Sequence, residues 1–213
     1  MFDFISLTIE NNNLKHFLNV GCHIGTISLP ISKLINQVSC VEAYNPTYKH
    51  LEENIKLNRI TNIKSYNFGL GNSNEDIYFM SENKICPIEN KNRLKNNSGG
   101  QHIFTQNDID ENRRSSILTD KKIKNTIKKL DETDIDNFDI MLVDIEGSEY
   151  NFLLGAKNKI MKNKPIIIIE IWNNQKRMLE NMNTTREDII KLIEDMNYKI
   201  IGSNGEDFVF QYS

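Results

Sequence analysis

Short apolar runs and helical periodicities alternate along the first third of the chain. A run over 17–20 ends at a glycine, and further runs follow over 38–42 and 63–68. Between the runs, apolar side chains recur every three or four residues over 27–35 and over 48–55. Short runs are typical of buried strands, and the longer period is typical of helices. This part of the sequence therefore predicts a β-α-β-α-β unit.

The alternation of strands and helices returns in the second half of the chain. The pattern predicts a strand over 139–144, a helix with an apolar face after it, and a strand over 166–170 that opens with four consecutive isoleucines. Continuous apolar runs are typical of central strands that are covered on both faces. Thr184 and Glu187 have the spacing of a capping box, which predicts the start of another helix.

Two final strands are expected over 198–202 and 207–211, with a short turn between them. Because a connection this short joins only antiparallel neighbours, one strand must run against the others. The whole pattern predicts an α/β fold with a mostly parallel sheet, helices on both faces and an antiparallel strand near the C-terminus.

A long polar segment separates the two halves. After an expected strand over 76–80, residues 81–129 are weakly patterned and contain an Asn- and Gly-rich stretch at 96–100. Segments of this kind inside a compact domain are usually functional lids, binding loops or disordered inserts. We interpret residues 81–129 as an insert in a single domain spanning 1–213, and residues 1–16 as an N-terminal arm.

The residues that follow the strands are the candidates for function, because ligands of mostly parallel sheets bind beyond the carboxyl ends of the strands. The first such loop runs from Asn19 to Gly25, with glycines at 21 and 25. This spacing differs from the G-x-G-x-x-G of dinucleotide-binding loops. Glu42 ends the second strand, where a carboxylate can accept hydrogen bonds from both hydroxyls of a ribose. Together they favour an adenosine-containing cofactor, the alternatives being a plain turn and a solvated carboxylate.

Three carboxylates lie at the tip of the strand over 139–144, namely Asp144, Glu146 and Glu149. Asp144 and Glu146 are two positions apart, so an extended backbone would point both side chains the same way. Such a pair can hold a substrate amine or hydroxyl, act as a general base or bind a divalent cation. For Glu149, a favourable position at the start of the following helix is an equally good explanation.

Three further residues are weaker candidates. Glu170 ends the isoleucine run and either joins the acidic residues or faces solvent. Trp172, the only tryptophan, either stacks on a sugar ring or packs in the wall of the fold. His102, in the polar insert, either accepts a hydroxyl proton or is an ordinary surface histidine.

Composition removes several functional classes. A net charge of −3 disfavours general binding to nucleic-acid backbones, and no apolar stretch approaches the roughly 18 residues that span a bilayer. Cys22, Cys40 and Cys86 are odd in number and widely spaced, which fits neither a disulfide framework nor a structural zinc site. We therefore expect a cytoplasmic protein with no nucleic-acid or membrane partner. Basic residues between 113 and 129 form either a solvated face or a site for an anionic substrate.

Taken together, these motifs resemble the FkbM family of S-adenosylmethionine-dependent methyltransferases. The resemblance runs from Phe17 to Phe210, and its most specific part is the acidic block followed by Leu154-Gly155-Ala156. The matching segments are 19–25, Glu42, 51–58, Leu130-Asp131, 143–149, 154–156 and Pro165 with the isoleucine run. The resemblance implies a Rossmann-like class I methyltransferase fold with a seven-stranded sheet. It also implies transfer of a methyl group to a hydroxyl, often on a sugar or a glycosylated product.

The resemblance also implies roles for single residues. The positions assigned to S-adenosylmethionine are Asn19, Gly21, Cys22, His23, Gly25, Glu42, Phe68 and Gly69. Among them, Glu42 would bind the ribose, and Asn19 stands where the family usually has Asp. Asp144 and Glu146 would face the sulfonium and the acceptor, and we expect one of them to take the hydroxyl proton, with His102 as a weaker candidate. A carboxylate-bound Mg²⁺ that acidifies the hydroxyl is an alternative, with no metal ligands assigned.

Two other functions stay open at this point. A NAD-dependent oxidoreductase of Rossmann type would share the strand order and Glu42, but the glycine spacing and the lack of an obvious proton-transfer pair disfavour it. A catalytically inactive methyltransferase-like binding module would fit Asn19 and His23. The insert over 81–129 is the candidate acceptor-binding lid, and its basic residues suit a nucleotide-sugar or another anionic acceptor. The sequence leaves the acceptor, a small molecule or glycan, and the oligomeric state open.

Overall fold

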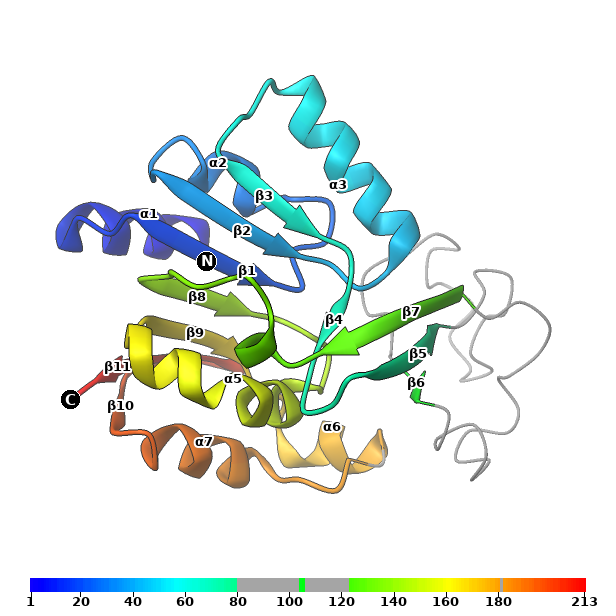
Figure 1. Ribbon diagram of the computed structural model, residues 1–213. Coiled ribbons are helices and arrows are strands. Elements are labelled where there is room, and N and C mark those ends of the chain that lie inside the picture. Colours follow the sequence, from blue (N-terminus) through cyan, green and yellow to red (C-terminus); the bar gives the residue numbers. More distant parts are fainter. Residues whose placement is uncertain (80–103, 106–122, 181) are drawn as a thin grey trace.

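A seven-stranded sheet forms the main body of the computed structural model, which describes residues 1–79, 104–105, 123–180 and 182–213. Its strands are β1 (His16–Val20), β2 (Gln37–Val41), β3 (Ile63–Tyr66), β8 (Ile140–Val143), β9 (Ile166–Glu170), β10 (Tyr198–Asn204) and β11 (Asp207–Tyr212). They lie in the order β10-β11-β9-β8-β1-β2-β3 (Figure 1). β11 is antiparallel to both β9 and β10, whereas the other neighbours pair in parallel. The predicted sheet is confirmed.

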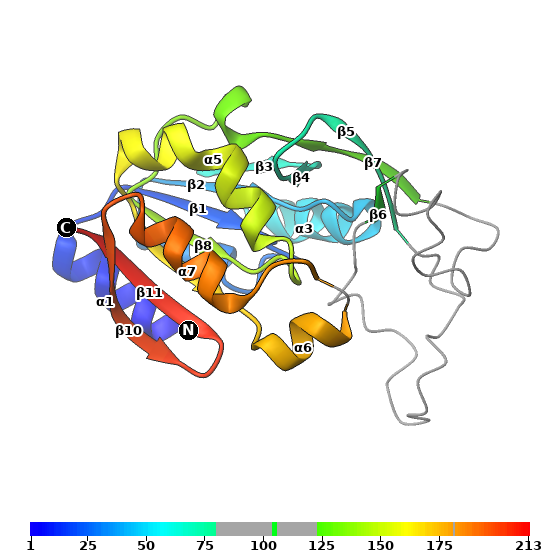
Figure 2. The same ribbon diagram turned by 90° about the horizontal axis from the view of Figure 1, so that it is seen from below.

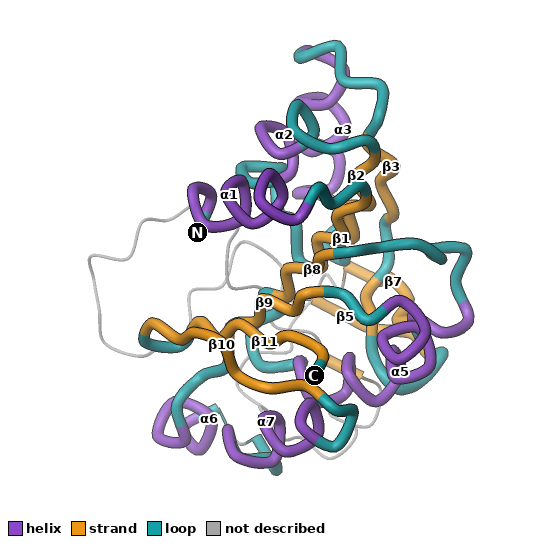
Figure 3. Tube along the Cα trace, turned by 90° about the vertical axis from the view of Figure 1, so that its left-hand side faces the viewer, coloured by secondary structure: helices purple, strands orange, loops and turns teal. Residues whose placement is uncertain are grey.

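Helices cover both faces of this sheet (Figure 3). They are α1 (Phe2–Asn12), α2 (Ser28–Ile31), α3 (Asn45–Leu57), α5 (Glu149–Asn163), α6 (Asn174–Leu179) and α7 (Arg186–Glu194). α1, α2 and α3 share one apolar cluster, to which Ile168 of β9 belongs. α5 and α7 share the other cluster with Ile167 and Ile169. The isoleucine run is therefore continuous because successive side chains enter two cores. Within the described residues, no helix has the length and apolar character needed to cross a lipid bilayer.

The segment expected as an N-terminal arm, residues 1–16, contains α1 and the start of β1. α1 buries Ile5 and Ile9 completely or almost completely in the cluster that it shares with α2 and α3. Phe4 and Leu7 lie on its exposed side. Burial of two isoleucines ties this helix to the main body.

A second, four-stranded sheet lies beyond the carboxyl ends of the main strands (Figures 1 and 2). It consists of β4 (Gly69–Leu70), β7 (Ile123–Lys128), β5 (Glu75–Phe79) and β6 (Phe104–Thr105), in that order. β5 was expected from the sequence, but β7 was not. Asn125 interrupts the apolar alternation of β7, which concealed the strand in the sequence. Its polar side chain has a partner, because it donates a hydrogen bond to the Ala43 carbonyl at 2.6 Å. The remainder of the polar insert, with His102 and Cys86, lies outside the described residues.

Gly155 explains the Leu-Gly-Ala part of the sequence pattern. A Cβ atom at this position of α5 would lie 1.8 Å from the carbonyl oxygen of Gly71, just after β4. Only glycine allows the helix to approach this backbone so closely. The motif therefore marks the contact between the main body and the second sheet.

The predicted capping box of α7 is wrong by one residue. Thr185 caps the helix, with its side chain accepting from the backbone N–H of Asp188, whose carboxylate accepts in return from Thr185. Thr184 has another partner, because its carbonyl accepts a hydrogen bond from Arg177 Nε at 2.7 Å. α7 buries Ile189 and Ile193 against the sheet.

Candidate active site

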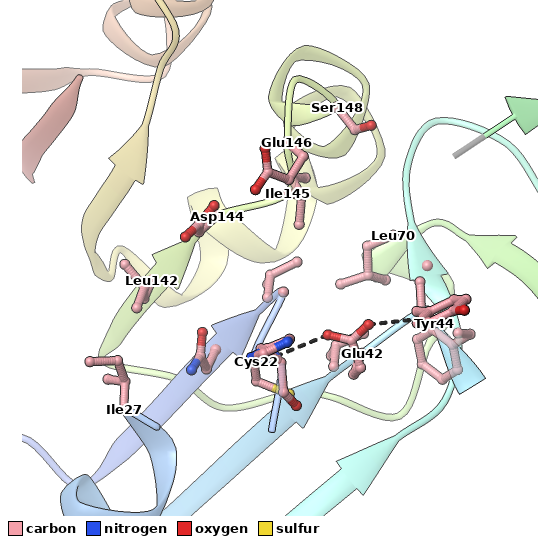
Figure 4. Close-up of a pocket in the computed structure, with 18 of the residues that line it drawn as sticks. Cys22, Ile27, Glu42, Tyr44, Leu70, Leu142, Asp144, Ile145, Glu146 and Ser148 are labelled. Atoms are coloured by element: carbon pink, nitrogen blue, oxygen red, sulfur yellow. Dashed lines mark hydrogen bonds between the residues drawn. The ribbon is translucent and has the colours of Figure 1, made fainter. Parts of the chain in front are cut away.

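A cavity of about 310 Å³ opens at the carboxyl ends of β1, β2 and β8 (Figure 4). At this point the strand order reverses, because the chain leaves β1 for β2 on one side while β8 lies on the other. Such a switch point is where ligands of open α/β sheets bind. Most of the residues that the sequence marked as candidates line this cavity.

Gly21 brings the β1–α2 loop against the tip of β8. Its φ is +82°, and a Cβ atom there would lie 1.8 Å from the Asp144 carbonyl oxygen. Gly25 also has a positive φ, but a Cβ there would meet Leu29 and Leu51. Gly25 is not among the residues that line the cavity. Of the two glycines, Gly21 shapes the site and Gly25 serves packing.

Glu42 is held by two backbone amides. Its Oε2 accepts from the His23 N–H at 2.9 Å, and its Oε1 accepts from the Tyr44 N–H at 2.8 Å (Figure 4). Burial raises the pKa of the Glu42 carboxyl, and these two hydrogen bonds oppose that rise. An ionised carboxylate has about four acceptor positions, so each oxygen can still accept another hydrogen bond. Glu42 is therefore oriented and has capacity for two hydroxyls of a ligand.

Asn19 lines the cavity and has an acceptor that the described residues leave without a partner. The side chain is 2% exposed, and its Nδ2 donates to Ser28 Oγ at 2.8 Å. Among the described residues, Asn19 Oδ1 has no hydrogen-bond partner. A buried polar atom without a partner is costly, and a donor from a ligand would satisfy it. Asn19 thus suits an amine or ammonium group in the cavity.

The other polar side chains of the glycine loop are electrically neutral. Burial lowers the pKa of His23, which favours the uncharged imidazole. Burial and a hydrogen bond with the Cys40 thiol raise the pKa of Cys22 well above its usual range. Both residues line the cavity. This part of the site therefore adds no positive charge that would repel a cationic ligand.

An apolar wall completes this side of the cavity. Phe68 and Gly69 line it, as expected, and so do Tyr44 and Phe79, which the sequence analysis missed. The rings of Tyr44 and Phe79 meet edge to face, with centroids 5.2 Å apart. The position of Tyr44, two residues after Glu42, was a signal that could have revealed it. Phe79 had none, because its place depends on how the second sheet packs.

Asp144 and Glu146 both line the opposite side of the cavity (Figure 4). The reason expected from an extended backbone is wrong, because Glu146 has a φ of +53° and Gly147 one of +98°. Both residues reach the cavity because the chain makes a turn between β8 and α5. Burial raises the pKa of both carboxyls, and the negative charge of Glu146 raises that of Asp144 further.

Glu149 is buried and has its partners within the protein. Its side chain is fully buried at the first position of α5, where Oε1 accepts from the Gly147 N–H at 2.9 Å. Its Oε2 lies 3.5 Å from Nη1 of the buried Arg177. Burial raises the pKa of Glu149 to about 7. Glu149 does not line the cavity, so its place at the start of the helix explains it best.

Glu170 joins the acidic side, and Trp172 packs in the wall. Asp144 and Glu170 act on each other, since Asp144 raises the pKa of Glu170 and Glu170 lowers that of Asp144. The Trp172 indole nitrogen donates to Glu170 Oε2 at 3.1 Å, and this ring is 1% exposed. Lys176 Nζ lies 3.7 Å from the centroid of the ring. Of the two alternatives for Trp172, packing in the wall is the one that the structure shows, because the ring is covered.

The residues that the structure describes offer no candidate metal site. No three His, Cys, Asp or Glu residues among them come together in a way that could hold a metal ion. The alternative in which Mg²⁺ acidifies the acceptor hydroxyl therefore has no support from this site.

The model of the methyltransferase FkbM domain matches residues 19–200. The chain belongs to the FkbM methyltransferase family. The match covers both loops that line the cavity, from Asn19 to beyond Glu149. The resemblance read from the glycine loop and the acidic block is confirmed. No curated protein matches the sequence.

Solved methyltransferase structures share the fold of this FkbM-family chain. FkbM from Methylobacillus flagellatus KT aligns with a TM-score of 0.56 at 15% identity, over 93% of this chain and 43% of that one. An O-methyltransferase from Bacillus cereus in complex with SAH aligns at 0.53 and 11%, over 97% and 77%. Magnesium protoporphyrin IX methyltransferase from Synechocystis PCC 6803 with bound SAM aligns at 0.52 and 9%, over 100% and 78%. The fold is therefore Rossmann-like, and the chain spans less than half of the Methylobacillus protein.

Proposed function

We propose that this FkbM-family chain is an S-adenosylmethionine-dependent O-methyltransferase that acts on a hydroxyl group of a sugar or glycan. The observation that carries the proposal is one cavity that joins Asn19, Glu42 and Asp144 at the ends of three adjacent parallel strands. These three side chains supply an unused acceptor, an oriented carboxylate and a candidate base. Solved relatives of the fold include proteins described as O-methyltransferases, which favours an oxygen acceptor.

The residues on the glycine-loop side fit S-adenosylmethionine. Asn19 Oδ1 would accept from the amine of its methionine half, and Glu42 would accept from the two ribose hydroxyls. The wall formed by Tyr44, Phe68 and Phe79 suits the flat adenine. The neutral state of His23 avoids a second cation beside the sulfonium.

Catalysis by the protein rests on position and on one proton transfer. The cofactor supplies a methyl group on a positively charged sulfur, open to in-line attack by an oxygen. The cavity walls would hold the acceptor oxygen in line for this attack. Asp144 would take the proton of the acceptor hydroxyl while its oxygen gains the methyl group, whose bond to sulfur breaks so that the cofactor leaves as a neutral thioether. Glu146, which lines the same wall, is the second candidate for this step.

The charge of the acceptor side favours a neutral acceptor. Asp144, Glu146 and Glu170 stand together there, and Lys176 is the cation that lowers their pKa values. A phosphate group would be repelled by these carboxylates. Two described basic residues of the insert have acidic neighbours, since Lys124 Nζ lies 2.6 Å from Asp76 and Lys129 Nζ lies 3.4 Å from Glu132. A third, Lys128, has its Nζ 4.7 Å from the centroid of the Phe68 ring. We therefore favour a neutral sugar or glycan over a nucleotide-sugar.

Calorimetry with two ligands tests the class of cofactor. We expect S-adenosylhomocysteine to bind to the purified protein and NAD not to bind. Binding of NAD alone would favour the oxidoreductase, and binding of neither compound would favour the inactive binding module. Either outcome contradicts the proposal.

Transfer of a labelled methyl group tests the acceptor. The protein is incubated with methyl-labelled S-adenosylmethionine and a panel of neutral sugars, glycans and nucleotide-sugars. We expect label in a neutral member of the panel, in an ether linkage that mass spectrometry assigns to one hydroxyl. Label confined to nucleotide-sugars would contradict the preference for a neutral acceptor, and label on nitrogen or carbon would contradict O-methylation.

A further inference from the structure

Asp144 and Glu170 are neighbours across two parallel strands. The register of β8 and β9 pairs Leu142 with Ile168 and Val143 with Ile169, so Asp144 and Glu170 are the next pair. Adjacent strands lie about 4.8 Å apart. Leu142 and Ile168 enter the same apolar cluster, the one shared with α1. Because side chains alternate along a strand, those of Asp144 and Glu170 also share one face.

Trp172 fixes the Glu170 side chain. The indole nitrogen donates to Glu170 Oε2 at 3.1 Å. The ring itself is held, because it is buried and a Cβ at Gly147 would lie 3.1 Å from its Cζ3 atom. One oxygen of Glu170 therefore has a rigid partner. A hydrogen bond between the Glu170 and Asp144 carboxyl groups would require that one of the two carries a proton.

Only one member of this pair reaches the cavity. Asp144 lines it, and Glu170 does not. Glu170 therefore touches neither the expected position of the acceptor nor that of the cofactor, and any effect on the reaction must pass through Asp144.

We propose that Glu170 is a positioning residue, which carries a proton, donates it as a hydrogen bond to Asp144 and so holds the Asp144 carboxylate in place at the cavity. The role of Asp144 as the base rests on the proposed function, whereas the pairing of the two carboxyl groups does not. In the reaction, the proton of the acceptor passes to Asp144 while Glu170 keeps its own. The pair thereby changes from one negative charge to none.

The charged groups around the pair favour a retained proton. Asp144 faces Glu146 and Asp207, Glu170 faces Glu206, and Lys176 faces both. Burial and these carboxylates raise the pKa values of Asp144 and Glu170, and Lys176 opposes the rise. The positive α-amino group of the chain lowers the pKa of Asp207, whereas burial and Glu206 raise it. Negative groups outnumber positive ones, so the pair loses its last proton at a higher pH than isolated carboxyl groups do.

The single tryptophan makes the pair observable. Trp172 is the only tryptophan of the chain, and its indole touches Glu170, so its fluorescence reports the protonation of that carboxyl group. We expect the emission of the unliganded protein to change with pH in one transition, with a midpoint above the ordinary value of about 4.3 for Glu. Glu170→Gln should abolish the transition, because its amide does not titrate.

Asp144→Asn is the decisive variant, because it removes the charge that faces Glu170. We expect the midpoint to fall by about 1 pH unit. Glu194→Gln, the same kind of change at an exposed position of α7, is the matched control and should leave the midpoint in place. A wild-type protein without a transition, or an Asp144→Asn variant with an unchanged midpoint, would overturn the pairing.

A second arm connects the pair with the reaction. Saturating S-adenosylmethionine, whose sulfur is positive, should lower the midpoint, whereas S-adenosylhomocysteine, whose sulfur is neutral, should leave it nearly unchanged. If calorimetry shows that both bind and neither moves the midpoint, the assignment of Asp144 as the base fails. If neither binds, the proposed function fails, while the titration of the protein alone still decides the pairing.

Turnover distinguishes positioning from bulk structure. Glu170→Gln keeps a donor for Asp144 and an acceptor for the indole, so methyl transfer should stay within about threefold of wild type. Glu170→Ala removes both and should lower kcat by about 100-fold with little change in KM. Thermal unfolding of both variants identifies a loss that is due to misfolding. Loss of turnover in a folded Glu170→Gln variant would overturn the positioning role and assign proton transfer to Glu170 itself.

Discussion

The two sides of the cavity differ in how their polar and charged side chains are surrounded. On the glycine-loop side, Glu42 accepts from two backbone N–H groups, and Asn19 is anchored to Ser28. On the other side, the negative charge of Glu146 raises the pKa of Asp144, that of Glu170 raises the pKa of Glu146, and Lys176 opposes both effects. The first side is organised by partners from the protein, whereas the second holds like charges close together.

This difference separates binding from chemistry. A side whose polar groups already have partners forms before any ligand arrives, which lowers the cost of ordering on binding. A side with carboxyl groups in contact costs stability, and such clusters with shifted pKa values are typical of catalytic positions. We therefore assign cofactor binding to the glycine-loop side and proton transfer to the acidic side.

The largest effect is expected from Asp144→Asn. An amide cannot take the acceptor proton, so kcat should fall by about 10²- to 10⁴-fold. The affinity for S-adenosylhomocysteine should stay nearly unchanged, because the cofactor side is intact. Labelled methyl transfer and calorimetry measure the two quantities, and Asp195→Asn, at an exposed position after α7, is the control. Normal turnover in Asp144→Asn would remove the residue from the mechanism.

Gly21→Ala should disturb both sides at once, because this glycine lies against the Asp144 carbonyl. The added Cβ and the positive φ together should lower the free energy of unfolding by about 3 kcal/mol. Gly205→Ala is the matched control, with a φ of +68° and no atom within 4 Å of the added Cβ, and should cost about 1 kcal/mol. Urea unfolding measures both. Equal losses would mean that the contact between Gly21 and Asp144 is not tight.

Glu149 tests whether a buried carboxyl beside the acidic side is structural. Its pKa rises from 4.5 to about 7 on folding. Between these values the folded state keeps a proton that the unfolded state loses, so the free energy of unfolding falls as pH rises through this window. Over the whole window, Glu149 lowers the free energy of unfolding by about 3 kcal/mol. Glu149→Gln should remove this loss. Urea unfolding at several pH values checks this.

Three other carboxyl groups also have raised pKa values, namely Asp144, Glu146 and Glu170. The free energy of unfolding of Glu149→Gln should therefore still fall with pH, but less steeply. Glu194→Gln should keep the full slope of the wild type, because this carboxyl is exposed. If the free energy of unfolding depends on pH in the same way in Glu149→Gln and in the wild type, Glu149 is ionised throughout. The attraction to Arg177 then outweighs the effect of burial on the pKa of Glu149.

The smallest effect is expected from Glu42→Gln, which affects only the cofactor side. The amide nitrogen cannot accept, so one backbone N–H and one ribose hydroxyl lose a partner. The affinity for S-adenosylhomocysteine should fall by about 10- to 100-fold, as is usual for hydrogen bonds to a charged group. Calorimetry measures the change, with the exposed Glu53→Gln as control. Unchanged affinity would exclude Glu42 from ribose binding.

Much of this architecture could be predicted from the sequence, because periodicity and strand-end position are local properties. The isoleucine run over 166–169 revealed a central strand. Glu42 and Asp144 were found because they directly follow strands, and Asn19 because it lies near the end of β1. Where the prediction failed, a distant contact was the reason. Thr184 lost the cap of α7 because Arg177 binds it, and Asn125 concealed β7 because its partner is Ala43.

What the sequence by itself determined is the order of strands and helices, the family and the loops that meet at one edge of the sheet. Only the tertiary structure decided which side chains touch across that edge. The chain from Trp172 through Glu170 to Asp144 depends on the register of two strands, and Phe79 reaches the cavity through the packing of a second sheet. Local propensity sets the elements, whereas register and packing join residues far apart in sequence, so these contacts leave no local pattern.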